Sequence, residues 1–322
     1  MRLVILGAGA IGGVVAGHLA RANRDVLLLA RGAQLAAIRE RGLQVDTPAG
    51  AFVAKLPVAE ATAGIEWRPD DVLVVATKTQ DVAAALAEVA APAWVPIACM
   101  TNGLEAERIA LRHSREVYGV CVFLPGTYLE PGVVRVWAAP VPGLFEVGRY
   151  PDGTGERADD FAGELNVAGF SCVVRTSVMK WKRGKLLSNL ANGAEAISGR
   201  EARTSVLMTT AQAEARACYA AANLSCTTDA EDAARRADIT SAPIAGATRT
   251  GGSTWQSLAR GLGALETDYL NGEIVLLGRL HGVATPVNEA LQLLAAEAAR
   301  TRAKPGALPL AELIARVDAH AR

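Results

Sequence analysis

The chain carries no excess of charge and few aromatic side chains. Its 322 residues include 33 Lys plus Arg and 33 Asp plus Glu, so the formal net charge is +0. A protein that binds nucleic acid or an anionic membrane through its overall charge is strongly basic, so we expect neither as a partner. Aromatic residues make up only 5% of the chain, which also argues against a surface that stacks nucleic-acid bases.

The cysteines are few, odd in number and widely spaced, and no Cys-x-x-Cys pair occurs. The sequence therefore predicts neither a disulfide framework nor a structural zinc site, and no metal ligand set is expected. Buried, reduced thiols in a cytoplasmic protein are the expected state of these side chains. They are Cys99, Cys121, Cys172, Cys218 and Cys226.

Two apolar stretches imitate membrane signals. Residues 3–20 follow Arg2 in the manner of a signal peptide, but glycines occupy positions 7, 9, 12, 13 and 17. Residues 82–100 carry a single charge, yet Pro92 and Pro96 interrupt them, which predicts a helix followed by a buried strand rather than a membrane span. We therefore expect a soluble protein.

The rest of the composition favours a folded protein of two domains. Hydrophobic residues make up 51% of the chain, enough for a sizeable core, and this length is typical of two domains. In the first half, near-continuous apolar segments alternate with helical patterns, which is typical of strands buried on both faces of a parallel sheet. The segments predicted as strands are residues 2–6, 25–29, 72–76, 95–100 and 117–123. The fold class predicted is α/β with a doubly wound parallel sheet.

A glycine motif follows the first predicted strand and opens a helix. It reads Gly7-Ala8-Gly9-Ala10-Ile11-Gly12. The first glycine permits a tight turn, the second lets the backbone approach a pyrophosphate, and the third allows close packing of helix on strand. The helix N-terminus then offers N–H groups and a partial positive charge to that phosphate. The motif predicts a Rossmann-type dinucleotide site and removes the signal-peptide interpretation.

Three side chains that follow predicted strands indicate a site for NADP(H) and a small anion. Arg31 stands where an NAD site usually has a carboxylate, and its guanidinium can hold a 2′-phosphate. Lys78 could meet a cofactor phosphate or a substrate carboxylate, and Asn102 the nicotinamide side of the cofactor. Each of the three could also be an ordinary loop residue.

The pattern becomes helical after residue 176, which we take as the domain boundary. Residues 1–176 are predicted to form an NADP-binding Rossmann domain, and residues 177–322 a helical substrate and catalytic domain. Within the first, residues 126–150 are expected to form antiparallel strands at an edge. Within the second, residues 242–263 are a glycine-rich loop that either contacts substrate or merely connects helices. Helices are predicted at residues 179–192, 205–223, 227–237, 266–281 and 286–302.

One face of a predicted helix carries Lys185, Asn189 and Asn192. At about 100° per residue, the positions four and seven residues after Lys185 lie within about 40° of it around the helix axis. On such a face an ammonium can polarise and protonate a carbonyl oxygen while the amides orient it. A solvated helix face with a stop after Asn192 is the alternative. Lys182, one turn earlier, competes with Lys185 for the role of acid.

Glu266 opens a predicted helix just after the glycine-rich loop that contains Ser253. A carboxylate is favourable at a helix N-terminus for electrostatic reasons alone. A carboxylate that faces Lys185 would instead keep the lysine charged and oriented, or would bind a substrate hydroxyl.

Taken together, these motifs resemble the ketopantoate reductase (2-dehydropantoate 2-reductase) family from residue 1 to about residue 300. The resemblance is carried by the glycine motif, Arg31, Lys78, Asn102, the KLLSN helix, the GGS loop and ETDYLNG, in that order. Its most specific parts are K-L-x-x-N at Lys185–Asn189 and E-x-D-Y-x-N-G at Glu266–Gly272.

The resemblance implies an N-terminal Rossmann domain, a helical C-terminal domain and a cleft between them. It also implies that NADPH delivers hydride to C2 of the 2-oxo acid ketopantoate, giving D-pantoate for pantothenate and coenzyme A synthesis. By the match, Lys185 is the general acid, Glu266 its partner and substrate anchor, and Asn189 and Ser253 contact the substrate. Lys78 and Asn102 match cofactor and active-site positions of the family.

The chain departs from the family pattern on the substrate side. The family often has a second helix asparagine eight residues after the lysine, where Gly193 stands here, and Asn192 is one position early. The stretch from Ser253 to Glu266 is also one residue longer than in some members. These departures leave the cofactor residues intact.

Three alternatives stay open. The resemblance implies a small 2-oxo acid as substrate, and another branched acid could replace ketopantoate. A β-hydroxyacid dehydrogenase is the nearest rival enzyme, but that family has its helical Lys and Asn three residues apart, whereas Lys185 and Asn189 are four apart. A non-catalytic NADPH-binding sensor would have no use for Lys185 and Glu266. A homodimer is left open as the assembly.

Overall fold

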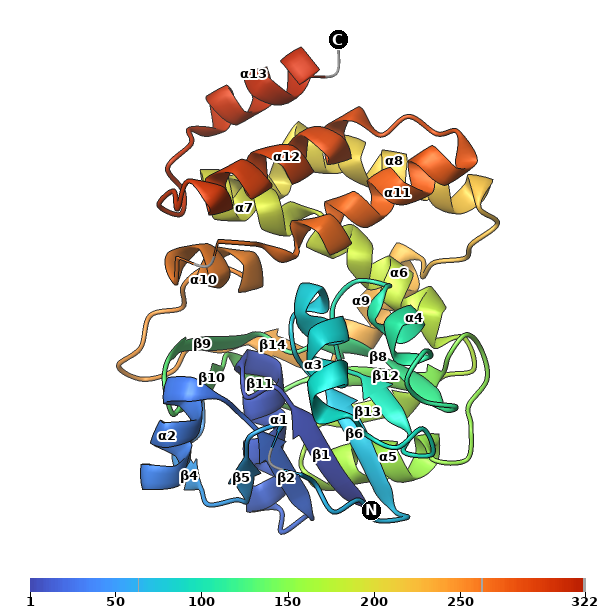
Figure 1. The fold of residues 1–322 in the computed structure, drawn as a ribbon. Coiled ribbons are helices and arrows are strands. Elements are labelled where there is room, and N and C mark those ends of the chain that lie inside the picture. Colours follow the sequence, from blue (N-terminus) through green and yellow to red (C-terminus); the bar gives the residue numbers. More distant parts are fainter. Residues whose placement is uncertain (63, 262, 321–322) are drawn as a thin grey trace. The chain divides into compact units, whose positions relative to one another are not determined.

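The computed structural model describes residues 1–62, 64–261 and 263–320. The chain forms two compact units, one built around a sheet and the other from helices (Figure 1). The first unit comprises Met1–Lys182 and Thr228–Arg249, and the second comprises Arg183–Thr227 and Thr250–Arg322. The chain thus enters the second unit, returns to the first for 22 residues (228 through 249) and re-enters the second, whereas the sequence pattern placed one boundary near residue 176.

The first unit contains an eight-stranded sheet with the order β13-β12-β8-β7-β6-β1-β2-β5. Neighbouring strands are parallel except β12 and β8, which run antiparallel. All residues of β1 and β6 are buried, which explains why their sequences show no polar alternation. The strands are β1 (Arg2–Leu6), β2 (Val26–Leu29), β5 (Val58–Ala59), β6 (Asp71–Val75), β7 (Ile97–Cys99), β8 (Val117–Phe123), β12 (Leu144–Arg149) and β13 (Ser171–Val174).

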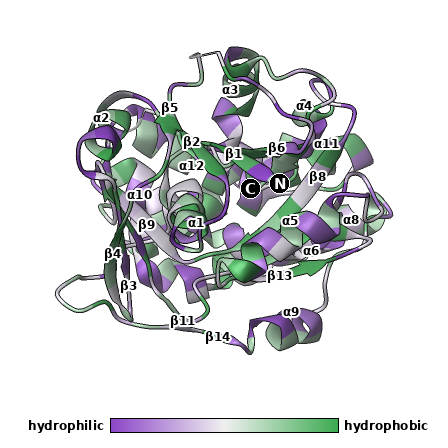
Figure 2. Ribbon diagram, turned by 90° about the horizontal axis from the view of Figure 1, so that it is seen from below, coloured by the Kyte–Doolittle hydropathy of each residue, from purple (hydrophilic) through white to green (hydrophobic). Residues whose placement is uncertain are grey.

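Helices pack on both faces of this sheet, as the prediction of a doubly wound fold requires. Two separate apolar clusters form, one with side chains of α1 (Ala10–Arg21) and α5 (Ala158–Val167) and the other with α3 (Val82–Val89) and α4 (Ala106–Ala110). In Figure 2 the hydrophobic colour runs along β1 and β2. The α/β fold predicted from the sequence is confirmed.

The apolar stretch at residues 82–100 is the helix α3 followed by the buried strand β7, as predicted. Across the described residues, no helix is long and apolar enough to cross a membrane. Four of the five cysteines are buried, and the fifth, Cys226, is partly exposed.

Two small sheets complete the first unit. The four-stranded one has the order β4-β3-β10-β9 and includes the antiparallel pair β9–β10 expected within residues 126–150. The two-stranded one pairs β11 with β14. The strands are β3 (Leu43–Thr47), β4 (Gly50–Ala54), β9 (Gly126–Glu130), β10 (Val133–Val136), β11 (Ala138–Pro140) and β14 (Ile239–Ser241).

The returning segment is attached to the first unit by polar groups and by Ile239, which is buried in its apolar core. Its helix α9 (Asp229–Arg236) has no buried residue, but Arg235 pairs with the buried carboxylate of Glu146 on β12 and donates to the backbone oxygen of Ser171 at 2.7 Å. Strand β14 of this segment pairs with β11 in antiparallel orientation. These long-range bonds explain why residues 228–249 leave the helical unit.

The described part of the second unit is helical (Figure 1). Its elements are the end of α6 (Val178–Asn189), α7 (Ala191–Ser198), η2 (Arg200–Thr204), α8 (Val206–Ala221), α10 (Ser253–Ala259), η3 (Glu266–Tyr269), α11 (Asn271–His281), α12 (Pro286–Arg300) and α13 (Leu310–His320). Two predictions need correction: residues 179–192 form two helices that break at Leu190, and the loop predicted at residues 242–263 contains α10.

Candidate active site

The glycine motif forms the tight turn between β1 and α1. Gly7 has φ +113, and a Cβ there would lie 3.0 Å from the backbone of Ala76 and Thr77, so only glycine fits. A Cβ on Gly12 would lie 2.0 Å from the Gly7 oxygen, so the third glycine allows α1 to pack on the strand. A Cβ on Gly9 would meet nothing within 4 Å, which leaves the space that a pyrophosphate needs to approach the backbone.

The N-terminus of α1 fits an anion. The helix begins at Ala10, its N-cap is Gly9, which has no side chain to bond the first amides, and no acidic residue stands in the first turn. The amides of Ala10, Ile11 and Gly12 therefore point out of the helix end with its positive partial charge. The residues present fit the pyrophosphate of a dinucleotide.

Gln34 supports this turn and was not predicted from the sequence. Its side-chain amide donates to the backbone oxygen of Ala8 at 2.7 Å and accepts from the amide of Gly132 at 2.6 Å. Gln34 is buried in α2 (Gly32–Arg41). The sequence shows only a glutamine just after the second strand; its burial, and the need of a buried amide for partners at both ends, are seen only in the structure.

Arg31 follows β2 and is the N-cap residue of α2. Its side chain is exposed. The position after the second strand is the one expected for a ribose contact, and an exposed guanidinium there can reach a 2′-phosphate. Arg31 thus precedes α2 with an exposed side chain, and its role stays a prediction.

Lys78 and Asn102 follow β6 and β7, whose ends are paired in parallel register at Val75 and Cys99. Both side chains therefore start from the same edge of the sheet as the glycine turn, since β1 pairs β6. The hydroxyl of Thr79 donates to the backbone oxygen of Asn102 at 3.0 Å and ties the two loops together. The first unit thus gathers the glycine turn, Lys78 and Asn102 at one edge.

Two further hydroxyls at this edge were missed by the sequence prediction. Within the described residues, the Oγ1 atoms of Thr77 and Thr101 are buried and have no hydrogen-bond partner. A buried hydroxyl without a partner is costly, so both are candidate ligand contacts. Their positions directly before Lys78 and Asn102 were the available signal.

Lys182 has a structural partner. Its ammonium pairs with the carboxylate of Glu107 and donates to the backbone oxygen of Thr101 at 3.1 Å, and both charged side chains are buried. Burial raises the pKa of Glu107, and the charge of Lys182 opposes that rise. The competing candidate for the acid is therefore engaged within the first unit.

Lys185 lies on the last turns of the same helix, in the second unit. Its side chain is partly exposed, and its nitrogen lies 3.5 Å from the hydroxyl of Ser188. Asn189, four residues on, is buried at 5% exposure. As predicted, Lys185 and Asn189 share one helix at a spacing that puts them on one face.

The single helix predicted through Asn192 is interrupted at Leu190, although the backbone angles of Leu190 stay helical (φ −58, ψ −26). Helix α6 ends at Asn189 and α7 begins at Ala191. The backbone oxygen of Leu190, at the break, accepts from the side-chain amide of Asn271 at 3.2 Å. The Oδ1 of Asn192 accepts from Arg203 at 3.1 Å.

Ser253 and Glu266 start two other elements of the second unit. Ser253 starts α10 instead of lying in a loop, and its Oγ is buried without a partner among the described residues. Glu266 is 3% exposed and starts η3, a 3₁₀ turn directly before α11. Since Asn271 at the start of α11 bonds to Leu190, the segment that carries Glu266 is fastened to the end of the helix that carries Lys185.

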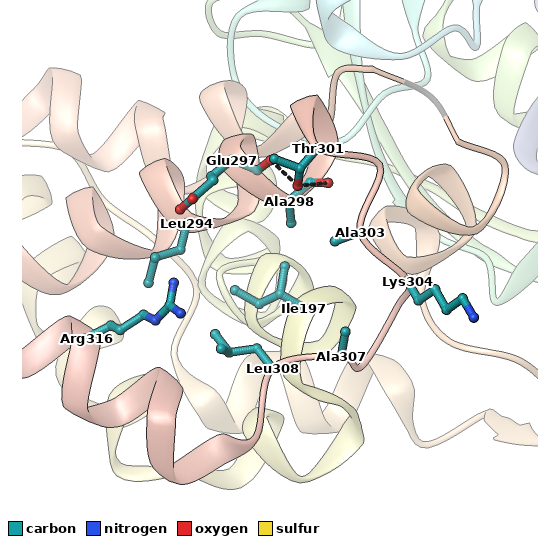
Figure 3. Close-up of a pocket in the computed structure, with 10 residues that line it drawn as sticks. All are labelled: Ile197, Leu294, Glu297, Ala298, Thr301, Ala303, Lys304, Ala307, Leu308 and Arg316. Atoms are coloured by element: carbon teal, nitrogen blue, oxygen red, sulfur yellow. Dashed lines mark hydrogen bonds between the residues drawn. The ribbon is translucent and has the colours of Figure 1, made fainter.

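A cavity of about 200 Å³ lies elsewhere in the second unit (Figure 3). It is lined by Ile197, Leu294, Glu297, Ala298, Thr301, Ala303, Lys304, Ala307, Leu308 and Arg316. None of the predicted site residues is among these ten, so this cavity is not the predicted site. Among the described residues, no group of three or more His, Cys, Asp or Glu side chains could hold a metal ion.

Two protein-family models match the chain. The model described as ketopantoate reductase PanE/ApbA matches residues 3–152, and the model described as ketopantoate reductase PanE/ApbA C terminal matches residues 178–298. These matches confirm the resemblance drawn from the motifs.

Individual relatives and solved structures agree with the family match. The 2-dehydropantoate 2-reductase of Pyrococcus horikoshii is 33% identical over 196 residues, which are 59% of this chain and 62% of that enzyme, so the aligned region spans less than two thirds of it. The enzyme of the same name from Halobacterium salinarum is 26% identical over 89% of this chain and 95% of its own length.

A crystal structure of a PanE/ApbA family ketopantoate reductase from Ralstonia eutropha superposes with a TM-score of 0.77 at 25% identity, covering 94% of this chain and 99% of that one. A D-mandelate dehydrogenase solved with NADH and anilino(oxo)acetate gives a TM-score of 0.80 at 20% identity with the same coverage of both chains. The second likeness concerns the fold alone.

Proposed function

The chain belongs to the ketopantoate reductase family, and we propose that it reduces a 2-oxo acid to the 2-hydroxy acid with NADPH as the reductant. Ketopantoate, which would yield D-pantoate for pantothenate and coenzyme A synthesis, is the first candidate substrate. Another branched 2-oxo acid is the alternative, because Gly193 and Asn192 depart from the family pattern on the substrate side.

One observation carries the proposal: of the two competing lysines on α6, Lys182 is buried against Glu107, whereas Lys185 is partly exposed one turn from Asn189. A proton donor for a substrate carbonyl must reach the substrate, and Lys182 is committed to a buried ion pair. Lys185 is therefore the side chain that we assign as the general acid.

The second unit supplies the proton in this proposal. NADPH supplies a hydride to C2 when it is bound. The ammonium of Lys185 donates its proton to the carbonyl oxygen, which becomes the hydroxyl of the product, and the neutral amine regains a proton from solvent. Asn189, Asn192 and Ser253 bind and orient the acid, and Glu266 holds Lys185 in its charged form or anchors the substrate.

The first unit supplies the cofactor residues in this proposal. The amides at the start of α1 bind the pyrophosphate, and Arg31 binds the 2′-phosphate, which favours NADPH over NADH. Lys78 and Asn102, with the unpartnered hydroxyls of Thr77 and Thr101 beside them, bind the nicotinamide half or the substrate carboxylate.

The experiment is a panel of 2-oxo acids, branched, linear and aromatic, supplied with NADPH or NADH and followed by the absorbance of the reduced cofactor. We expect the highest kcat/KM for a branched acid with NADPH. If the purified protein binds NADPH but turns over no acid in the panel, the chain is a cofactor-binding sensor and the proposed activity is wrong.

A further inference from the structure

An ion pair in the second unit connects three segments: the end of α6, the start of α7 and the start of α10. These segments carry the proposed substrate contacts Asn189, Asn192 and Ser253. Glu195 on α7 and Arg203 on η2 lie with Oε2 and Nη1 2.7 Å apart. The carboxylate side chain is 9% exposed and the guanidinium side chain 33% exposed. A pair this sheltered is held in one geometry more firmly than a surface pair.

Arg203 uses the same guanidinium to hold the α6–α7 break. Nη1 also donates to the Oδ1 of Asn192 at 3.1 Å, and Nη2 donates to the backbone oxygen of Ser188 at 3.3 Å. Ser188 directly precedes Asn189. One planar side chain therefore fixes Asn192 itself and the backbone next to Asn189.

Glu195 reaches the third segment. Its Oε1 accepts from the backbone amide of Gly252 at 3.3 Å, directly before Ser253 at the start of α10. The approach is close, because a Cβ on Gly252 would lie 2.9 Å from Oε2 of Glu195 and 3.9 Å from Oδ1 of Asn192. The Oγ of Ser253 is left buried without a partner within the described residues.

We propose that Glu195 is a positioning residue that, through Arg203 and the Gly252 amide, sets the spacing of Asn189, Asn192 and Ser253 and thereby the affinity for the acid. The inference rests on the proposed function, since these three side chains are its substrate contacts. Glu195 itself touches neither cofactor nor reacting atoms in this scheme, so its effect belongs to acid binding and not to proton transfer.

The test compares Glu195→Gln with Glu201→Gln, an exposed glutamate on η2. Glu195→Gln keeps an acceptor for Gly252 but removes the charge that orders Arg203. We expect the KM for the acid to rise roughly tenfold, while kcat and the KM for NADPH change less than about twofold. Arg203→Lys, at a more exposed position, keeps the positive charge but cannot reach three acceptors at once, and should raise the acid KM similarly.

The double variant Glu195→Gln/Arg203→Lys should add little to either single change, because both break one unit. An unchanged acid KM in both single variants overturns the inference. So does a fall in kcat at unchanged KM, since that reports loss of folded protein or an effect on the chemical step instead of on acid binding. Wild-type protein that neither binds nor reduces any acid overturns the proposed function instead, and this positioning role with it.

Discussion

The ammonium of Lys182 lies against the carboxylate of Glu107, and 2% and 0% of the two side chains are exposed. Lys185, three residues further along the same helix, is partly exposed. One helix thus carries a lysine that is buried in an ion pair of the first unit and a partly exposed lysine that we propose as the general acid.

Replacing Lys185 should damage turnover. We expect Lys185→Ala to lower kcat about 10²-fold or more, as loss of a general acid does, while NADPH binding is retained. Stopped-flow or steady-state assays give kcat, and cofactor fluorescence gives the Kd for NADPH. Lys180→Ala on the same helix, where the lysine pairs with Glu231 at 2.6 Å on the surface, should leave kcat near that of the wild type. Normal turnover in Lys185→Ala would remove Lys185 from the mechanism.

Replacing Lys182 should damage stability. Lys182→Met leaves the buried carboxylate of Glu107 without its partner, and breaking such a pair costs about 3–5 kcal/mol of unfolding free energy. Denaturant unfolding of the full chain measures the loss. Because removing both charges is far less harmful, the double variant Lys182→Met/Glu107→Leu should recover most of it; no recovery would contradict the assignment of the pair.

Arg31 should discriminate between the two nicotinamide cofactors. Arg31→Ala removes the guanidinium proposed to hold the 2′-phosphate, so we expect NADPH affinity to fall roughly tenfold or more and NADH affinity to change little. Titration of each cofactor against the variant and against Arg39→Ala, an exposed arginine of the same helix α2, provides the comparison. Equal losses for both cofactors would rule out Arg31 as the NADP determinant.

His18 should make stability fall at mildly acidic pH. It is largely buried in α1 between the rings of Phe52 and Phe170, and desolvation by burial lowers its pKa to about 4. An unfolded chain protonates histidine near its ordinary pKa of 6.5, so between these values the unfolded state binds the extra proton. Stability should therefore fall from about pH 6.5 down to about pH 4, by about 3 kcal/mol in total.

The measurement for His18 is the unfolding free energy as a function of pH. His18→Leu should lack this part of the slope, and replacing the exposed His281 by Gln should keep it. Parallel curves for the wild type and His18→Leu between pH 6.5 and pH 4 would show that His18 is not the titrating group.

Replacing two helix glycines by alanine should change the stability of the protein in opposite directions. A Cβ on Gly193 in α7 would meet ordinary contacts, Ala295 at 3.5 Å, Thr267 at 3.6 Å and Asn271 at 3.7 Å. Gly193→Ala should therefore stabilise the protein by about 0.5–1 kcal/mol through the higher helix propensity of alanine. A Cβ on Gly184 in α6 would lie 1.7 Å from the Thr227 hydroxyl, so Gly184→Ala should destabilise. Thermal unfolding of both variants decides; a lower Tm for Gly193→Ala would contradict the prediction.

Local patterns were sufficient for much of the fold and for the cofactor side. Strand β1 and the glycine turn could be predicted because each glycine answers a local requirement of backbone geometry, and Gly7 indeed has φ +113. The family match confirmed the resemblance and, with it, NAD(P)H as the class of cofactor. The preference for NADP(H) and the roles of the site residues stay predictions.

The substrate side was harder to predict because helical periodicity does not show a helix break that is stabilised by residues far away in the sequence. Residues 179–192 follow one pattern, yet the chain breaks at Leu190, whose oxygen accepts from Asn271, 81 residues away. Asn271 is held in turn by the buried Asn288 at 3.0 Å. The hydrogen bond that Asn192 accepts from Arg203 could not be foreseen either, because the helical pattern does not show which side chains the fold brings to it.

By itself, the sequence determined the α/β class, the dinucleotide turn and the candidates Lys185, Asn189 and Glu266, because propensity, periodicity and motif spacing act within a few residues. Only the tertiary structure paired Lys182 with Glu107, returned residues 228–249 to the first unit, and joined Glu195 to Arg203 and Gly252. Those outcomes depend on which buried charges and amides find partners far along the chain, and a buried polar group without a partner is what folding avoids.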